Sequence, residues 1–139
     1  MTTRPANWNE SVIEEFRANQ GKVGGRFEGR TLLLLHHTGA KSGEARINPL
    51  ACVRDGANLI IIASKGGAPT NPAWLHNLKA HPDVTVEVGT ETRPVRARIV
   101  TEEPERSQLY AKMVAVFPGF ADYEKNTTRK IPVVVLSPR

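Results

Sequence analysis

The residues best suited to chemistry begin with a short basic turn at residues 38–43, which read TGAKSG. Two glycines bracket Lys41 and Ser42 between two expected strands, and Arg46 follows on the second strand. Such a turn can aim backbone N–H groups, a hydroxyl and an ammonium at one phosphate, while the guanidinium closes the site. A P-loop is excluded, because it needs a glycine just before the lysine and a helix after it. Two interpretations stay open: a phosphate site, or a basic hairpin turn with a solvated lysine.

A second candidate is the segment from Ala63 to Trp74, which reads ASKGGAPTNPAW. A buried strand runs into two glycines, which let a backbone approach a flat ring closely. Asn71 and Pro72 then predict the start of a helix, with the asparagine capping free N–H groups and the proline in the first turn. Because a helix N-terminus favours electron-rich groups, this segment could hold a planar heterocycle with carbonyl oxygens. The alternative is a plain strand–turn–helix connection.

An aromatic cluster, Phe117 to Tyr123, leaves the last expected helix. It could form a wall for an apolar acceptor, with the Tyr123 hydroxyl as a hydrogen-bond or proton donor. The alternative is that these rings are core residues.

Metal and thiol chemistry find little support in the sequence. His36 and His37 are adjacent, so on a strand they face opposite ways and cannot chelate one metal together. His76 and His81 lack a partner at ligand spacing. Cys52 is the single cysteine, which excludes an intramolecular disulfide and predicts a small core side chain. We therefore expect no metal.

Hydrophobic periodicity predicts the elements that must position these residues. Helices are expected over residues 8–20, from Asn71 to His81, and over 104–117. Asp55-Gly56 is a strong hairpin signal, because glycine adopts positive φ without steric cost. Strands are expected at Thr31–His36, Arg46–Arg54, Leu59–Ser64, Val84–Val88, Val95–Ile99 and Ile131–Leu136. Together they predict a closed or nearly closed barrel with added helices.

Composition and charge narrow the class of protein. The chain has 139 residues, enough for one domain, with 40% hydrophobic and 24% charged residues. No apolar run reaches the roughly 20 residues of a membrane-spanning helix, and a signal-peptide core is lacking, so a cytoplasmic, reduced setting is expected. The net charge of +5 indicates an anionic partner. Nucleic acid is disfavoured, because the basic residues scatter instead of clustering with exposed aromatics.

Taken together, these motifs resemble the deazaflavin-dependent nitroreductase family. The family's basic turn matches residues 38–43, and its following R-x-x-P matches Arg46 to Pro49. Its A-S-x-G-G-A-x-x-N-P-x-W segment is intact from residue 63 to 74. The closing aromatic motif and the terminal R-x-I-P-V-x-x-L match residues 118–123 and 129–136. The resemblance spans residues 27–138.

The resemblance implies an α+β, mainly β fold: a split β-barrel of about six mostly antiparallel strands with flanking helices. It implies coenzyme F420, an 8-hydroxy-5-deazaflavin, as the cofactor. Carried over by position, Lys41, Ser42 and Arg46 lie near the cofactor phosphate. The contacts with the ring or the ribityl chain would be Asn48, Pro49, Ala63, Ser64, Lys65, Gly67, Ala68, Asn71, Trp74 and Asn77.

The implied activity is transfer of hydride from reduced F420 to an organic acceptor, such as a quinone, a nitro compound or an activated alkene. The substrate pocket would be lined by Phe117, Phe120 and Tyr123, with Tyr123 as the catalytic hydroxyl. Some members carry tyrosine where this chain has Phe120, so one pocket hydroxyl is missing, which bears on nitroimidazole reduction. A non-catalytic F420 carrier and an FMN-dependent reductase on the same fold stay open as alternatives.

The expected organisation is an N-terminal helix and glycine-rich link at residues 1–26, followed by the deazaflavin-binding barrel at 27–139. Lys22 and Arg26 would lie along the anionic tail of the cofactor. A peripheral membrane contact through residues 8–20 stays open, and with it membrane association of a cytoplasmic protein. The expected partner is a small-molecule acceptor, and the protein is expected to be a monomer or a homodimer.

Overall fold

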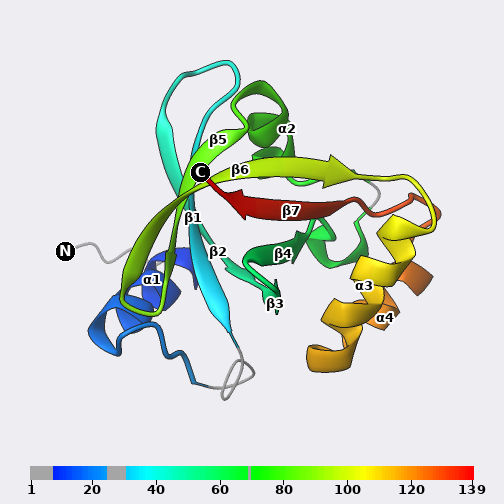
Figure 1. The fold of residues 1–139 in the computed structure, drawn as a ribbon, viewed down its shortest axis with the longest axis horizontal. Coiled ribbons are helices and arrows are strands. Elements are labelled where there is room, and N and C mark those ends of the chain that lie inside the picture. The colour runs from blue at the N-terminus through cyan, green and yellow to red at the C-terminus, as the bar shows by residue number, and fades with distance from the viewer. Residues whose placement is uncertain (1–7, 25–30, 69) are drawn as a thin grey trace.

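The computed structural model describes residues 8–24, 31–68 and 70–139, and this part of the chain is a curled sheet flanked by helices (Figure 1). The strands are β1 (Leu32–Thr38), β2 (Ala45–Ala51), β3 (Val53–Asp55), β4 (Asn58–Ile62), β5 (Asp83–Val88), β6 (Glu91–Val100) and β7 (Val133–Pro138). The helices are α1 (Trp8–Ala18), α2 (Ala73–Ala80), α3 (Glu105–Val116) and α4 (Phe120–Lys125), with a 3-10 turn, η2, at Lys65–Gly67. This mainly β architecture confirms the predicted fold class. Arg26, which was expected along the anionic tail of the cofactor, lies outside the described residues.

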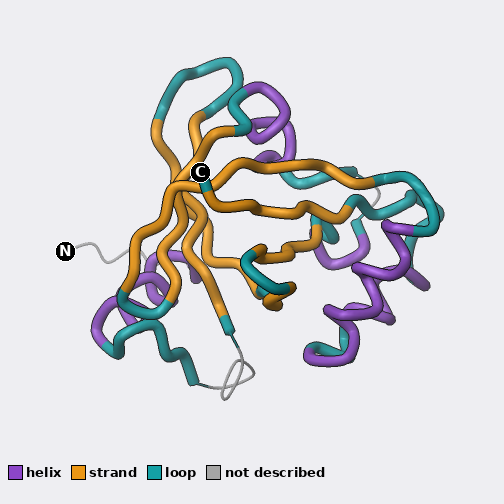
Figure 2. Tube along the Cα trace, viewed as in Figure 1, coloured by secondary structure: helices purple, strands orange, loops and turns teal. Residues whose placement is uncertain are grey.

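The sheet is closed by β2 and β3, which follow each other along the chain with a kink at Cys52. The strand order is β2-β1-β5-β6-β7-β4-β3, and each neighbouring pair is antiparallel. β2 and β3 stand at opposite ends of this order, yet only Cys52 separates them along the chain. The sheet therefore curls until its two ends meet, which makes a split barrel (Figure 2). The expected strand over residues 46–54 is thus two strands joined at a kink, where the Cys52 N–H donates to the Thr31 carbonyl at 3.1 Å.

Both faces of the curled sheet are buried, and the leucine run of β1 shows how. Leu32 and Leu34 belong to one apolar cluster, called the first cluster below, whereas Leu33 and Leu35 belong to another. Successive side chains of a strand point to opposite faces, so an unbroken apolar run suits a strand that is buried on both. The strand expected at Thr31–His36 is confirmed by β1.

Helix α1 packs its apolar side chains against the first cluster. Val12 is 6% exposed and Phe16 is 1% exposed. Arg17 adds a polar contact, because its guanidinium donates to both carboxylate oxygens of Glu87 on β5, at 3.3 and 2.7 Å. Membrane contact through residues 8–20 is therefore not supported, since Val12 and Phe16 are already buried in the core of the protein. Among the described residues no helix is long and apolar enough to cross a membrane.

Helix α4 is the element that the sequence did not predict, since residues 120–125 were expected only as part of an aromatic cluster. It lies beside α3, which packs on β3, β4 and β7 (Figure 1). The Tyr110 hydroxyl of α3 donates to the Phe120 carbonyl at 2.6 Å. Arg106, also on α3, places Nη1 2.8 Å from the Glu124 carboxylate. These tertiary bonds hold a helix that is too short to be stable alone.

Candidate active site

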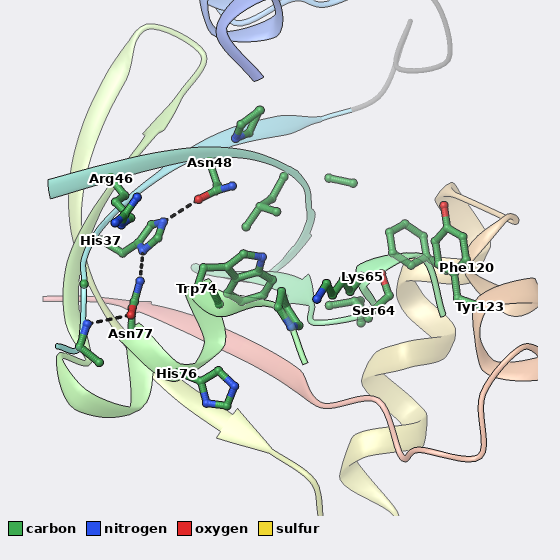
Figure 3. A pocket seen from close by; sticks show the side chains of 18 of the residues that line it. His37, Arg46, Asn48, Ser64, Lys65, Trp74, His76, Asn77, Phe120 and Tyr123 are labelled. Carbon is green, nitrogen blue, oxygen red and sulfur yellow. Dashed lines mark hydrogen bonds between the residues drawn. The ribbon is translucent and has the colours of Figure 1, made fainter. Parts of the chain in front are cut away.

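A cavity of about 1220 Å³ lies between β2, the end of β4, α2 and α4 (Figure 3). Its walls combine the basic turn after β1, one side of β2, the η2 segment and the aromatic side chains around α4. The lining residues are His37, Gly39, Ala40, Lys41, Ser42, Arg46, Asn48, Pro49, Leu50, Ala51, Ile62, Ser64, Lys65, Pro72, Ala73, Trp74, His76, Asn77, Phe117, Phe120 and Tyr123.

The cavity brings together most of the site residues that were predicted from sequence. Those that line it are Lys41, Ser42, Arg46, Asn48, Pro49, Ser64, Lys65, Trp74, Asn77, Phe117, Phe120 and Tyr123. The predicted contacts that do not line it are Ala63, Gly67, Ala68 and Asn71. The parts that all these residues play in binding stay predictions.

The basic turn stands at one end of the cavity. Two backbone hydrogen bonds close it, from the Gly39 N–H to the Glu44 carbonyl at 2.9 Å and from the Gly43 N–H to the Gly39 carbonyl at 3.0 Å. A Cβ at position 39 would overlap the Ser42 hydroxyl oxygen, so a larger residue there would force the Ser42 side chain to rotate. Arg46 pairs with the exposed Glu44 carboxylate, with Nη2 and Oε1 3.3 Å apart. Exposed pairs of this kind contribute little free energy, so Arg46 can exchange this partner for another anion.

A chain of hydrogen bonds joins the basic turn to the sheet and to α2 (Figure 3). His37 on β1 places Nε2 2.7 Å from Oδ1 of Asn48 on β2, and Nδ1 3.0 Å from Nδ2 of Asn77 on α2. The Asn77 Oδ1 accepts the Ala40 N–H at 2.8 Å. One tautomer satisfies each contact: Nε2–H donates to Asn48, and Nδ1 accepts from Asn77.

This chain of bonds requires an uncharged His37. Burial is the main cause that lowers the pKa of His37 below its usual 6.5; the hydrogen bond to Asn48 opposes the shift, and the charge of Arg46 adds to it. A second proton would turn Nδ1 into a donor that faces the Asn77 amide group. Rotating that amide would leave the Ala40 N–H without its acceptor, at a cost in free energy. The position of the basic turn therefore depends on the neutral ring.

The loop between β4 and α2 is held by Arg129, which does not itself line the cavity. The guanidinium donates to the carbonyl oxygens of Ala63, Ser64 and Ala68, at 3.2, 2.8 and 3.1 Å. A fourth bond joins its Nη1 to the Asn71 side-chain oxygen at 2.5 Å. The carbonyls of Ala63, Ser64 and Ala68 and the side chain of Asn71 therefore bind Arg129 and stabilise the loop.

The structure corrects one predicted role of Asn71. The sequence indicated that Asn71 caps the following helix, but α2 begins at Ala73, with Pro72 at the N-cap and no side-chain capping bond. The reason is competition, since the Asn71 oxygen accepts a charge-assisted bond from Arg129, and such bonds are stronger than those to a neutral N–H.

The aromatic end of the cavity is an edge-to-face stack. The ring centroids of Phe117 and Phe120 are 6.0 Å apart at 82°, and those of Phe120 and Tyr123 are 5.0 Å apart at 80°. Such T-shaped pairs are the favoured aromatic geometry. Figure 3 shows Trp74 and Lys65 between this stack and the His37 end. The cavity thus runs from a cationic end, past a buried indole, to an apolar end.

Sequence reasoning missed five residues of the cavity wall, which are His37, Leu50, Ala51, Ile62 and His76. Gly39, Ala40, Pro72 and Ala73 also line the cavity and lie within the two segments that the sequence singled out. His37 matters most, and the sequence considered it only as a metal ligand. The signal lies in strand register, because His37 stands opposite Arg46 in the β1–β2 ladder and so lies at the cationic end. In the described part of the chain, no group of three His, Cys, Asp or Glu side chains could hold a metal ion.

Comparison with known proteins identifies the family. The model of the family described as F420H(2)-dependent quinone reductase matches residues 8–138. The chain is 41% identical over 127 residues to an F420H(2)-dependent quinone reductase of Mycobacterium tuberculosis, a match that covers 89% of this chain and 85% of that protein. The chain therefore belongs to the F420H(2)-dependent quinone reductase family, which confirms the predicted relationship to deazaflavin-dependent enzymes.

Solved structures agree with the fold. One described as an F420-H2 dependent reductase is 38% identical with a TM-score of 0.70, covering 76% of this chain and 93% of its own. Another, described as a domain-swapped dimer, is 35% identical with a TM-score of 0.72, covering 92% and 98%. The heme storage protein HutZ from Vibrio cholerae, at 19% identity and a TM-score of 0.60 over 94% of this chain and 89% of its own, shares the fold alone.

We predict that His37→Gln keeps the chain of hydrogen bonds and that His37→Leu breaks it. Glutamine offers a donor and an acceptor to Asn48 and Asn77. Leucine instead leaves the Asn48 Oδ1 and the Asn77 Nδ2 without their partner, which costs about 2 kcal/mol or more of unfolding free energy. The wild-type unfolding free energy should also fall as the pH drops below 6.5, because the unfolded histidine binds its proton first. His37→Gln should lack this part of the slope.

Urea unfolding at about pH 7.5 and about pH 5.5 measures both effects. The difference between the wild type and His37→Gln isolates this ring from the other histidines, which both proteins share. Equal pH slopes in the two proteins would contradict a neutral His37 in the folded state.

Proposed function

We propose that this chain passes hydride from reduced F420 to a quinone-type acceptor in the cavity between β2, α2 and α4. Activity as an F420H(2)-dependent oxidoreductase follows from its family. The use of this cavity is supported by one observation: a single space of about 1220 Å³ joins a cationic turn, a buried tryptophan and an aromatic end. Such a space suits a long cofactor with a phosphate at one end and a reactive ring toward the other.

The donor set of the cavity fits F420. Lys41, Ser42 and Arg46 offer an ammonium, a hydroxyl and a guanidinium, the groups that bind phosphate. Asn48 keeps its Nδ2 group for a ligand, because its Oδ1 already accepts from His37. When bound, the cofactor supplies the hydride chemistry, since a deazaflavin has carbon where a flavin has nitrogen. The protein's own task is to orient the ring and the acceptor at reacting distance.

At the aromatic end, the chain provides an apolar wall and one hydroxyl. The stacked rings suit a flat acceptor such as a quinone and exclude water from it. A quinone that receives hydride gains negative charge on oxygen, which the Tyr123 hydroxyl can stabilise or protonate. The Tyr110 hydroxyl is committed elsewhere, because it donates to the Phe120 carbonyl.

The proposal includes a reduced, cytoplasmic setting and a monomer or homodimer. Cys52 is the single cysteine of the sequence, and burial raises the pKa of its thiol to about 12, which keeps it unreactive. The relative described as a domain-swapped dimer supports the homodimer as the first assembly to test.

Fluorescence titration with F420 and with FMN tests this function. We expect F420 to bind at least tenfold more tightly, since a tenfold preference is about 1.4 kcal/mol and one or two charge-assisted hydrogen bonds supply it. Equal affinities would favour the FMN-dependent alternative. Turnover of reduced F420 with a menaquinone-like acceptor separates a reductase from a carrier, which would bind F420 and leave the quinone unreduced.

We predict that Lys41→Ala and Arg46→Ala each weaken F420 binding about tenfold and flatten its salt dependence without unfolding the protein. Both side chains are exposed, so neither supports the core. Titration at two salt concentrations, with thermal unfolding in parallel, measures the effects.

Arg93→Ala is the matched control for Arg46→Ala. Arg93 pairs with Glu91 two residues away, as Arg46 pairs with Glu44, but Arg93 does not line the cavity. Its removal should leave F420 affinity within twofold of the wild type. If the Lys41 and Arg46 variants also stayed within twofold, the phosphate assignment would be wrong.

We predict that Tyr123→Phe lowers turnover about 10²-fold and leaves F420 affinity nearly unchanged, because only the hydroxyl is lost. The edge-to-face contact with Phe120 survives in the variant. Tyr110→Phe is the companion variant, and its loss should appear as a lower unfolding free energy, since its hydroxyl is bound to backbone. Steady-state kinetics with a menaquinone-like acceptor decide the matter. Unchanged turnover in Tyr123→Phe would mean that this residue only forms the wall.

A further inference from the structure

Arg129 opens the terminal R-x-I-P motif, which neither the cavity nor the proposed chemistry accounts for. Its guanidinium binds four acceptors of one loop, the carbonyls of Ala63, Ser64 and Ala68 and the side chain of Asn71. Ala63 and Ser64 precede the η2 turn, and Ala68 and Asn71 follow it. One side chain therefore fixes both ends of the segment that brings η2 to the cavity wall.

The loop has a backbone conformation that needs such support. Lys65 has a φ of 48° and Gly67 a φ of 84°, both in the left-handed region. A non-glycine residue there costs of order 1–3 kcal/mol and persists where the surrounding structure imposes it. Here the left-handed conformation is stabilised by the three carbonyls that bind one guanidinium, because charge-assisted hydrogen bonds are strong. The result places Lys65 at the cavity wall, with its Nζ 3.3 Å from the Thr70 hydroxyl.

The same loop touches the helix that carries the aromatic end. A Cβ at Gly67 would lie 3.0 Å from the Tyr123 carbonyl oxygen and 3.1 Å from the Asn126 Cβ, so the backbones are in close contact. The position of the loop therefore also sets how near Lys65 stands to the aromatic wall.

The shape of the guanidinium, and not its charge alone, explains these contacts. All four acceptors are neutral, and within the described residues Arg129 forms no ion pair. A lysine would keep the charge but lose the planar fork that reaches several acceptors at once. Replacing Arg129 with lysine therefore tests whether the shape of the guanidinium or its positive charge is what holds the loop.

We propose that Arg129 is a positioning residue for cofactor binding: by holding the loop from Ala63 to Asn71, it fixes Lys65 and the η2 backbone where the deazaflavin ring binds. It acts through the loop and not by touching the cofactor. This inference rests on the proposed function of the cavity.

F420 titration of the wild type, Arg129→Lys and Arg129→Gln tests the proposal. At a temperature where each protein is folded, both variants should bind F420 at least tenfold more weakly, and lysine should not rescue binding. Backbone amide hydrogen exchange of residues 64–68, measured without cofactor, should speed up in both variants. That second readout reports on the loop independently of activity.

Arg139→Lys is the matched control. Arg139 donates to the carbonyls of Val95 and Val84 at 2.9 and 2.8 Å, so it makes the same kind of bond, but it does not line the cavity or touch the loop. Arg139→Lys should lower the melting temperature and keep F420 affinity within twofold of the wild type.

Three outcomes would overturn the proposal, because Arg129 would then be purely structural. The first is an F420 affinity of Arg129→Lys equal to that of the wild type, and the second is an equal loss of F420 affinity in Arg139→Lys. The third is loss of folding in both Arg129 variants. A wild-type protein that does not bind F420 would contradict the proposed function itself, and this inference with it. The two failures are therefore distinguished by the wild-type titration alone.

Discussion

A buried, uncharged histidine between two asparagine amides sets the geometry on which the rest of the site depends. His37 needs a donor on one ring nitrogen and an acceptor on the other, which fixes the amide of Asn77 and through it the Ala40 N–H of the basic turn. The basic turn depends on the neutral His37 ring, and the neutral state of the ring depends in part on a residue beside that turn. Burial is the main cause of the low pKa of His37, and the charge of Arg46 adds to it. Arg46, a cation that suits a phosphate, thus also favours the neutral ring that holds the basic turn in place.

Two arginines far along the chain shape the opposite end of the cavity. Arg129 holds the loop beside Lys65, while Arg106, which is 5% exposed, donates to the Ile131 carbonyl at 2.9 Å and pairs with Glu124 on α4. Each guanidinium binds main-chain oxygen as well as one side chain, so both arginines help to place backbone segments. The part of the chain from α3 to β7 therefore supplies these supports, although Phe117, Phe120 and Tyr123 are its only described residues that line the cavity.

What the sequence could predict follows from local pattern. The strand at the leucine run of β1 and the Asp55-Gly56 hairpin were predicted correctly, because an unbroken apolar run and a turn pair are properties of neighbouring residues. The predicted cap at Asn71 was wrong, because its partner Arg129 lies 58 positions away. Likewise, no local pattern marks α4, which depends on bonds from α3. The motifs placed most of the cavity wall, whereas the contacts that hold the wall in position were visible only in three dimensions.

The place of β7 in the strand order has a consequence for how the protein folds. β7 lies between β6 and β4, and it is the strand that joins β3 and β4 to the remainder of the sheet. Leu59 pairs with Leu136, so this connection closes a long loop before it gains any contact energy. The barrel should therefore form late and cooperatively, on the slow timescale of folds rich in distant contacts. Until then the edges of β4 and β6 that face β7 stay unpaired, and unpaired strand edges favour aggregation.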